Sequence, residues 1–309
     1  HGLSMKVSNS VKLIEAFFVH RGVVEHGAFS AGALVEARVN EEERKATALN
    51  HTATHLLHAA LREILGPHVK QAGSLVSSHR FRFDFSHFSQ VAPETLKEVE
   101  QHVNQTIREN LPLTTSVLPR EEAMKTGAMA IFEERYGDHV RLVKVGDGVS
   151  MELCGGTHTL RTGDVGLFKI VSESAVGANL RRIEALTGKA ALDHVQNQEL
   201  EFKESASLLK TSPEQLRDRI DKLLKEQRQK DREIETLKSR LLSTQSEDLL
   251  SVVRDIKGAK VMVREVQAES PKDLRDVADR IKEKLDSGII VLGARKDDKA
   301  MLLCMVTKD

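Results

Sequence analysis

Apolar residues recur every three or four positions between Asn40 and Gly66, which is the period of an α-helix. Asn40 fits an N-cap, with Glu43 at the capping-box position, and Gly66 closes the segment before Pro67. The segment therefore predicts one long helix. Its apolar side consists of Leu49, Leu56, Leu57, Ala60 and Ile64.

The opposite side of this predicted helix carries three histidines, His51, His55 and His58. Residues three and four apart share a helix face, so the three imidazoles lie together. Because they are off the apolar side, a place in the core is disfavoured for them. Two interpretations remain, solvated surface residues or ligands of a metal ion. Spacing alone does not exclude His58 as a ligand.

Strict alternation over residues 80–86 predicts a half-buried strand with Phe81, Phe83 and Phe85 on one face. A helix is predicted over 93–110. Four further strands are predicted, at residues 140–145, 149–153, 167–171 and 180–186. Strands interrupted by helices with short connections indicate a largely antiparallel sheet with helices on one side. We therefore predict an α+β domain over residues 5–190.

A glycine-free stretch rich in Lys, Glu, Arg, Gln and Leu follows, from about residue 193 to 246. Ser212 and Pro213 mark a helix start. After them an unbroken 4-3 spacing, with two polar interruptions, runs through Leu216, Ile220, Leu223, Gln227, Lys230, Ile234, Leu237 and Leu241. Such a heptad seam predicts either a helical hairpin, with residues 193–209 as the partner helix, or a coiled-coil dimer contact. We assign residues 191–247 to a helical linker.

The remaining residues, 248–309, return to α/β character. Strands are predicted over 259–266, 288–292 and 300–306, and an amphipathic helix over 271–285. A compact unit of this kind needs more helix cover than these residues supply. We therefore expect a partial C-terminal α/β domain, and we predict Cys304 to be a core thiol.

Composition narrows the function classes. The 309 residues have a formal net charge of zero, so any nucleic-acid binding depends on local patches of charge. No apolar run approaches the roughly 20 residues of a membrane span. The two cysteines are far apart in the sequence and differ in context, which favours a reducing cytoplasm over a disulfide scaffold.

A second four-residue spacing, Cys154 with His158, complements that of His51 with His55. It follows the predicted strand at 149–153, and two glycines between Cys154 and His158 let the chain fold back. Three imidazoles and one thiolate suit a tetrahedral Zn²⁺ site. The two spacings together predict a zinc site.

Five motifs carry a family resemblance. They are Asn-His-Thr-Ala-Thr-His-Leu-Leu-His at 50–58, Gln-Ala-Gly-Ser-Leu-Val at 71–76, Arg-Phe-Asp-Phe-Ser-His at 82–87, Cys-Gly-Gly-Thr-His at 154–158 and Arg-Arg-Ile-Glu-Ala-Leu-Thr-Gly at 181–188. In their order along the chain and in their residues, these motifs resemble the editing domain of alanyl-tRNA synthetases. Free-standing alanyl-tRNA editing proteins and threonyl-tRNA synthetases share them in weaker form.

The resemblance implies that His51, His55, Cys154 and His158 hold zinc, and it leaves His58 outside the ligand set. It also implies that Gln71, in a predicted loop, belongs to the editing pocket. The family's ATP-dependent aminoacylation half is absent, as is a glycine-rich segment with a Gly-Gly-Gln motif. We therefore expect a fragment that covers the editing domain, the helical linker and part of the C-terminal domain.

In this family the editing domain hydrolyses Ser-tRNA(Ala) and Gly-tRNA(Ala). The full-length protein attaches alanine to tRNA(Ala) with ATP. For zinc, three roles remain open: activating water, orienting the aminoacyl group, or only holding helix and loop together. The alternative function is a zinc-stabilised tRNA-binding and oligomerisation module without activity. An unrelated zinc hydrolase is disfavoured, because the sequence has no His-Glu-x-x-His motif.

The expected partner is the acceptor end of tRNA(Ala), with a homodimer formed through the helical linker and the C-terminal domain. Four arginines are the predicted phosphate contacts. Such contacts position an RNA without reading its sequence. They are Arg80, Arg82, Arg181 and Arg182.

Overall fold

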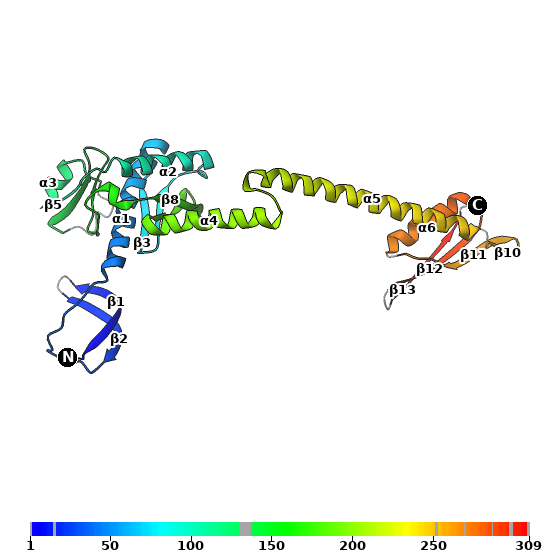
Figure 1. Ribbon diagram of the computed structural model, residues 1–309, viewed down its shortest axis with the longest axis horizontal. Helices are drawn as coiled ribbons and strands as arrows, with labels where there is room; N and C mark the ends of the chain where they lie inside the picture. Colours follow the sequence, from blue (N-terminus) through cyan, green and yellow to red (C-terminus); the bar gives the residue numbers. More distant parts are fainter. Residues whose placement is uncertain are drawn as a thin grey trace. The chain divides into compact units, whose positions relative to one another are not determined.

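The computed structural model describes residues 2–14, 17–129, 137–250, 253–268, 270–285, 287–296 and 299–307. The chain divides into two compact units, residues 1–198 and 199–309, and each is considered by itself (Figure 1). None of the described helices is long and apolar enough to cross a membrane.

The first unit is a mixed α/β structure whose sheets are antiparallel. Its elements are β1 (Ser4–Ile14), β2 (Phe17–His26), α1 (Glu41–Leu65), β3 (Gln71–Val76), β4 (Phe81–Ser86), α2 (Pro93–Arg108), β5 (Leu113–Pro119), α3 (Arg120–Lys125), β6 (His139–Val145), β7 (Ser150–Leu153), a 3₁₀ turn (Thr162–Val165), β8 (Phe168–Gly177), β9 (Leu180–Thr187) and the start of α4 (Gly188–Leu208).

A four-stranded sheet in the order β3-β4-β9-β8 forms the centre of this unit. The predicted alternation along β4 is confirmed, because Phe81, Phe83 and Phe85 are fully buried. They pack against Leu57 and Leu61 of α1 in one core, which also contains Val99, Val103 and Ile107 of α2. Alternating burial thus fixes which face of the sheet the helices cover.

The single sheet that we predicted is wrong in one respect. Strands β5, β6 and β7 form a separate three-stranded sheet, and β1 and β2 form a two-stranded hairpin of their own. The sequence of β5 gave no strand prediction, because its apolar residues Leu113, Val117 and Leu118 do not alternate regularly among two threonines and a serine. Helix α1 consequently packs against the four-stranded sheet on one side and against β7 on the other.

The second unit contains a four-stranded sheet and the helices around it. Its elements after α4 are a 3₁₀ turn (Pro213–Gln215), α5 (Leu216–Leu250), β10 (Arg254–Ile256), β11 (Ala259–Glu265), α6 (Pro271–Lys284), β12 (Ile289–Lys296) and β13 (Lys299–Val306). Strands β11 and β12 are parallel and are joined through α6, whereas the other pairs are antiparallel.

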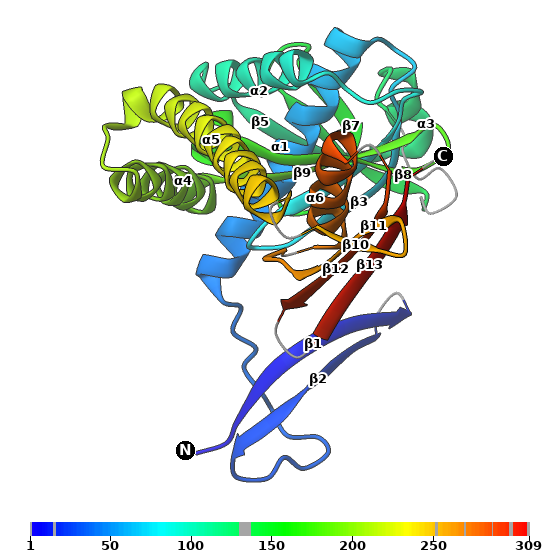
Figure 2. The same cartoon turned by 90° about the vertical axis from the view of Figure 1, so that its right-hand side faces the viewer.

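Helix α6 lies against this second sheet (Figure 2), and the core of the unit is formed between them. Buried Leu274, Val277 and Ile281 of the helix pack on Met262, Ile290 and Leu292 of the strands. The opposite face of the sheet is open, and Leu302 of β13 is 80% exposed. Cys304 shares the alternation of Leu302 and is exposed, so its prediction as a core thiol is wrong.

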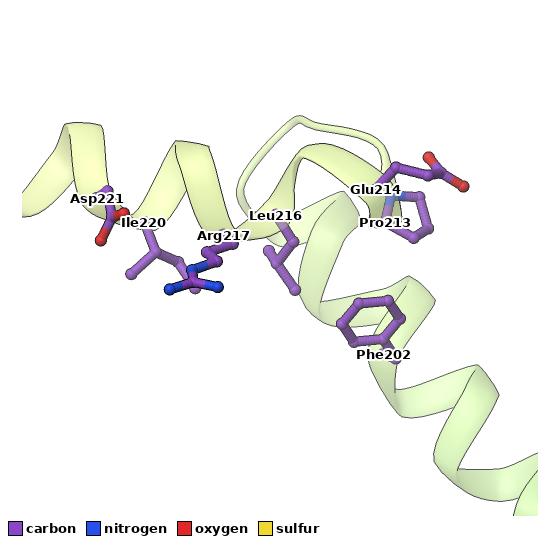
Figure 3. A pocket seen from close by; sticks show the side chains of 7 residues that line it. All are labelled: Phe202, Pro213, Glu214, Leu216, Arg217, Ile220 and Asp221. Carbon is purple, nitrogen blue, oxygen red and sulfur yellow. The ribbon is translucent and has the colours of Figure 1, made fainter.

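The heptad seam lies on α5, but most of its side chains are not packed. Leu216 is buried at the turn after α4, where an apolar hollow also contains Phe202 and Ile220 (Figure 3). From this turn the two helices leave in different directions (Figure 3). Ile234 and Leu237 are 50% and 54% exposed. The helical hairpin with residues 193–209 and the coiled-coil contact stay predictions.

Candidate metal centre

Helix α1 supplies two of the four predicted ligands from its middle. The helix begins at Asn40, whose side chain accepts hydrogen bonds from the backbone N–H groups of Glu42 and Glu43. It ends at Gly66, which has a φ of 115°. Asn50 ties the helix to the ends of two strands, because its amide donates to Ser77 O at 2.8 Å and accepts from Thr187.

The loop after β7 supplies the other two ligands. Strand β7 pairs with β6, and the N–H of Cys154 continues the ladder by donating to Arg141 O at 2.9 Å. The guanidinium of Arg141 in turn donates to Gly156 O. The loop is therefore anchored to β6 by its backbone at both Cys154 and Gly156.

Gly156 is required by close packing, and its φ is not positive. A Cβ at this residue would lie 1.7 Å from Cε1 of His51, so any larger residue would displace the imidazole. Gly155 has open space around the corresponding position. The loop thus approaches α1 closely only because residue 156 has no side chain.

The four predicted ligands converge. The ligand atoms of His51, His55, Cys154 and His158 all lie within 4.8 Å of one another. Sγ of Cys154 is 3.4 Å from Nε2 of His51 and 3.4 Å from Nε2 of His158. Ligand atoms around a tetrahedral zinc ion are separated by about 3.3–3.6 Å, given bond lengths of about 2.0–2.3 Å. The donor set and its spacing therefore fit Zn²⁺.

Burial of His55 and His58 contradicts the solvated-surface interpretation and leaves that of metal ligands. His55 and His58 are 4% and 2% exposed, so a solvated surface is wrong for them. The three-stranded sheet covers the side of α1 that the sequence left unassigned, and Glu152 of β7 lies against both rings. His51, Cys154 and His158 are half-buried, which leaves one side of the cluster accessible.

Electrostatics favour the form of Cys154 that binds metal. Burial raises the pKa of the thiol, but hydrogen bonds from His158 and His51 outweigh it and lower the pKa to about 3. Burial lowers the pKa of His55, but attraction to Glu152 and Cys154 outweighs it and raises the pKa to about 10. A metal ion must therefore displace a proton from His55.

His158 has a further contact that the sequence did not indicate. Its Nδ1 lies 3.3 Å from Oγ1 of Thr52, which also accepts the N–H of Thr159 at 3.1 Å. Thr52 is fully buried between the two helix histidines. The sequence indicated this contact only by placing a threonine next to a ligand histidine. Small polar residues are common on helices, so that neighbour alone did not predict a contact with His158.

Gln71 begins β3, at the edge of the four-stranded sheet, so its prediction as a loop residue is wrong. It pairs with Phe85, is half-buried, and its amide donates to Ser74 at 3.4 Å. Gly73 and Ser74 interrupt the apolar pattern of this segment, so periodicity did not predict the strand. A role of Gln71 in an editing pocket stays a prediction.

All four arginines predicted to contact tRNA are engaged with carboxylates. The shortest separations are 3.4 Å for Arg80 with Glu184, 3.9 Å for Arg82 with Asp84, 2.5 Å for Arg181 with Glu173 and 2.7 Å for Arg182 with Asp84. The side chain of Arg80 is 62% exposed and that of Arg181 only 13%. Arg80 is therefore the most accessible of the four to a phosphate.

Comparison with known proteins supports the family resemblance. Residues 140–184 match the family of the threonyl and alanyl tRNA synthetase second additional domain, a span that includes Cys154 and His158. The chain is 50% identical over 309 residues to an alanine–tRNA ligase of Desulfosudis oleivorans, covering 100% of this chain and 35% of that protein. It is 47% identical over 303 residues to an alanine–tRNA ligase of Pseudomonas syringae pv. tomato, covering 98% and 35%.

These relatives match the chain from the hairpin β1–β2 to the C-terminal sheet, and the family model falls on the loop that supplies half of the cluster. The chain spans about a third of their length. The resemblance to alanyl-tRNA synthetases is thus confirmed over all 309 residues, which align with one segment of the relative from Desulfosudis oleivorans.

Proposed function

We propose that this chain is the editing segment of an alanine–tRNA ligase and hydrolyses Ser-tRNA(Ala) and Gly-tRNA(Ala). The observation that carries the proposal is the convergence of His51, His55, Cys154 and His158 within 4.8 Å. Two of these side chains lie in the stretch that matches the threonyl and alanyl tRNA synthetase domain.

The chemistry of alanine selection explains the need for such a site. Glycine is smaller than alanine by a methyl group, and serine is larger by a hydroxyl. One methylene gives only about 1–3 kcal/mol of discrimination, and an apolar pocket rejects an added hydroxyl poorly. A single sieve cannot exclude both neighbours, so a second, hydrolytic site is the remedy.

The reaction is hydrolysis of the ester at the terminal ribose. Water adds to the ester carbonyl, the bond to the ribose oxygen breaks, and a proton passes to that oxygen. When bound, zinc supplies a Lewis acid that can stabilise negative charge. We assign the cluster the role of orienting the aminoacyl group, and we assign activation of water to neighbouring groups. The amide of Gln71 is proposed to hydrogen-bond in the pocket.

The acceptor end of tRNA(Ala) is the proposed partner, with Arg80, Arg82, Arg181 and Arg182 as phosphate contacts. To bind tRNA, each arginine must exchange its carboxylate partner for a phosphate. Arg80 gives up the least interaction energy, because its ion pair is the most exposed. We further propose a homodimer through α5 and the C-terminal sheet. The full-length protein is proposed to work in the cytoplasm and to attach alanine to tRNA(Ala) with ATP.

One observation favours a second function. Four protein ligands are typical of a closed structural zinc site, whereas catalytic zinc keeps a position for water. The cluster offers four ligands, His51, His55, Cys154 and His158. In this alternative the metal only joins α1 to the loop, and the segment binds tRNA and oligomerises without hydrolysis.

A deacylation assay separates the two. The purified chain is incubated with Ser-tRNA(Ala) and, in parallel, with Ala-tRNA(Ala), at high protein concentration to offset weak tRNA binding. The editing proposal expects loss of the seryl ester and survival of the alanyl ester. Equal rates for both, or serine hydrolysis that survives replacement of both His51 and Cys154 by alanine, would refute the editing proposal. Hydrolysis of neither ester by a chain that holds zinc and binds tRNA would leave the second function.

A further inference from the structure

Glu152 is a buried carboxylate that the proposed hydrolysis does not use. It lies in β7, two residues before Cys154, and its side chain is 2% exposed. Burial of an isolated carboxylate is expensive unless the charge is paired and hydrogen-bonded. Its partners must therefore account for its place beside the metal centre.

Two histidines of α1 converge on this carboxylate, one on each oxygen. Nδ1 of His55 lies 2.9 Å from Oε2, and Nδ1 of His58 lies 3.1 Å from Oε1. The hydroxyl of Ser150 donates to Oε1 at 3.2 Å. Residues three apart on a helix share a face, so the two rings reach one side chain of a neighbouring strand.

The two contacts are not equivalent. His58 Nδ1 forms a hydrogen bond with Glu152, whereas His55 Nδ1 meets Oε2 as an ion pair without a hydrogen bond. No other acceptor among the described residues bonds to Nδ1 of His55. At 2.9 Å, Glu152 is therefore the group that stabilises a proton on this nitrogen.

The surroundings of the His58 ring favour a proton on one of its two nitrogens. Its Nε2 is buried without a hydrogen-bond partner, and its ring packs against Phe83 with centroids 5.4 Å apart. A proton on Nε2 would be left unpaired in the core, and a buried donor without an acceptor loses its hydration without compensation. The proton therefore belongs on Nδ1, where it is donated to Glu152.

We propose that Glu152 is an outer-sphere carboxylate of the metal centre and that His58 is the residue that positions it. By keeping the proton of His55 on Nδ1, Glu152 leaves the lone pair of Nε2 free for a metal ion. Partners of this kind fix the tautomer and orientation of ligand histidines. The inference rests on the proposed zinc site.

Charge supports the same assignment. A divalent ion, one thiolate from Cys154 and three neutral imidazoles carry a net charge of +1 in a partly buried site. The carboxylate of Glu152 neutralises it. His58 thereby acquires a function without being a ligand: it is the second donor that holds the carboxylate in place.

The first test replaces Glu152 with glutamine, which keeps the volume and removes the charge. Its amide can accept from only one of the two Nδ1–H groups, so one ring must change tautomer or lose its partner. We expect zinc affinity, measured by competition with a chromophoric chelator, to fall about 10–100-fold. The visible spectrum of the Co²⁺-loaded chain is expected to shift. Exposed Glu63, paired with half-buried His102 at 3.4 Å, provides a matched control as Glu63→Gln.

The second test concerns His58 and keeps the inference testable if Glu152→Gln fails to fold. His58→Asn places an amide N–H close to the position of Nδ1, whereas His58→Leu fills the space without a donor. We expect the asparagine variant to keep zinc affinity within about threefold of the parent and the leucine variant to lose about tenfold.

The outcomes separate this inference from the proposed function. If the parent chain binds zinc and Glu152→Gln and His58→Leu bind it equally tightly with unchanged Co²⁺ spectra, the outer-sphere role is wrong and the zinc site stands. If the parent chain binds no zinc, both are wrong. Equal losses in His58→Asn and His58→Leu would also refute the positioning role of His58.

Discussion

Helices α1 and α5 have opposite relations between sequence pattern and burial. Helix α5 carries the more regular pattern, a heptad seam from Leu216 to Leu241, yet Ile234 and Leu237 on that seam are about half exposed. Helix α1 has a side made of histidines and threonines, and it is buried on both sides. His55 and His58 are among its most buried residues.

The difference teaches what periodicity measures. A heptad shows which side chains can pack together, whereas burial depends on whether a partner surface is present. In α1 the partner of the polar side is β7 and its loop, about a hundred residues later in the sequence. The contacts across that side are polar and depend on geometry, so no hydrophobic pattern marks them.

The largest expected effect lies on the polar side of α1. Cys154→Ala removes the thiolate of the cluster, and we expect zinc affinity to fall by more than about 100-fold, since one of four ligands is lost. Metal analysis after dialysis against a weak chelator measures this. Cys304→Ala is the matched control, because that thiol is exposed in β13 and should leave the zinc content at one per chain.

The apolar side of α1 should behave differently. Leu57 is fully buried against the phenylalanines of β4, so Leu57→Ala is expected to lower the free energy of unfolding by about 2–5 kcal/mol. The number of zinc ions per chain should not change. Leu224→Ala, at a 48% exposed position of α5, is the control, with an expected change within about 0.5 kcal/mol. Urea unfolding monitored by circular dichroism measures both.

The charged groups beside α1 make the metal-free chain sensitive to acid. The folded-state pKa of Cys154 is lowered from 9.0, so its stabilisation is complete above pH 9 and is lost as the pH falls towards 3. Attraction to His55 outweighs burial and lowers the pKa of Glu152 from 4.5, so its stabilisation is lost below that pH. The pKa of His55 is raised from 6.5 to about 10, so its stabilisation is present below pH 6.5 and is lost up to pH 10.

Together these shifts predict an asymmetric profile. Between pH 6.5 and 9 the contributions of His55 and Cys154 have opposite slopes and offset each other. Below pH 4.5 those of Cys154 and Glu152 add, so stability should fall most steeply there. Urea midpoints of the chelator-treated chain from pH 3.5 to 9 provide the measurement. A midpoint that is constant below pH 5 would contradict the assigned shifts.

Local signals in the sequence were sufficient for much of the fold. Asn40 and Gly66 marked the two ends of α1, because capping depends on neighbours within one turn. The phenylalanines of β4 alternate with polar residues, because successive side chains of a pleated strand point to opposite faces. The strand β3 at Gln71 and the division into two sheets depend on pairing between distant segments. Sequence spacing cannot report such pairing.

The candidate site shows the same limit. Spacing identified the four ligands, because an i,i+4 pair on a helix and a matching pair on a loop have a chemistry of their own. Glu152 and Thr52 were missed, although both touch ligand histidines. Their roles depend on which strand covers α1, and a single glutamate in an alternating strand is ordinarily a surface residue.

The smallest effect on the folded monomer is expected in α5, where Ile234 and Leu237 are about half exposed. Ile234→Asp and Leu237→Asp introduce charge at positions already half exposed, so unfolding of the monomer should change little, within about 0.5 kcal/mol for each. If the seam joins two copies of the chain, the same double variant should shift the mass measured by analytical ultracentrifugation from dimer to monomer, because a charged residue on a heptad seam is buried only at a large cost. A matched double variant, Glu233→Gln and Lys238→Gln, removes one charge of each sign beside the seam and should keep the mass of the parent. A parent chain that is monomeric at all concentrations would mean that the more regular of the two helix patterns has no partner in this protein.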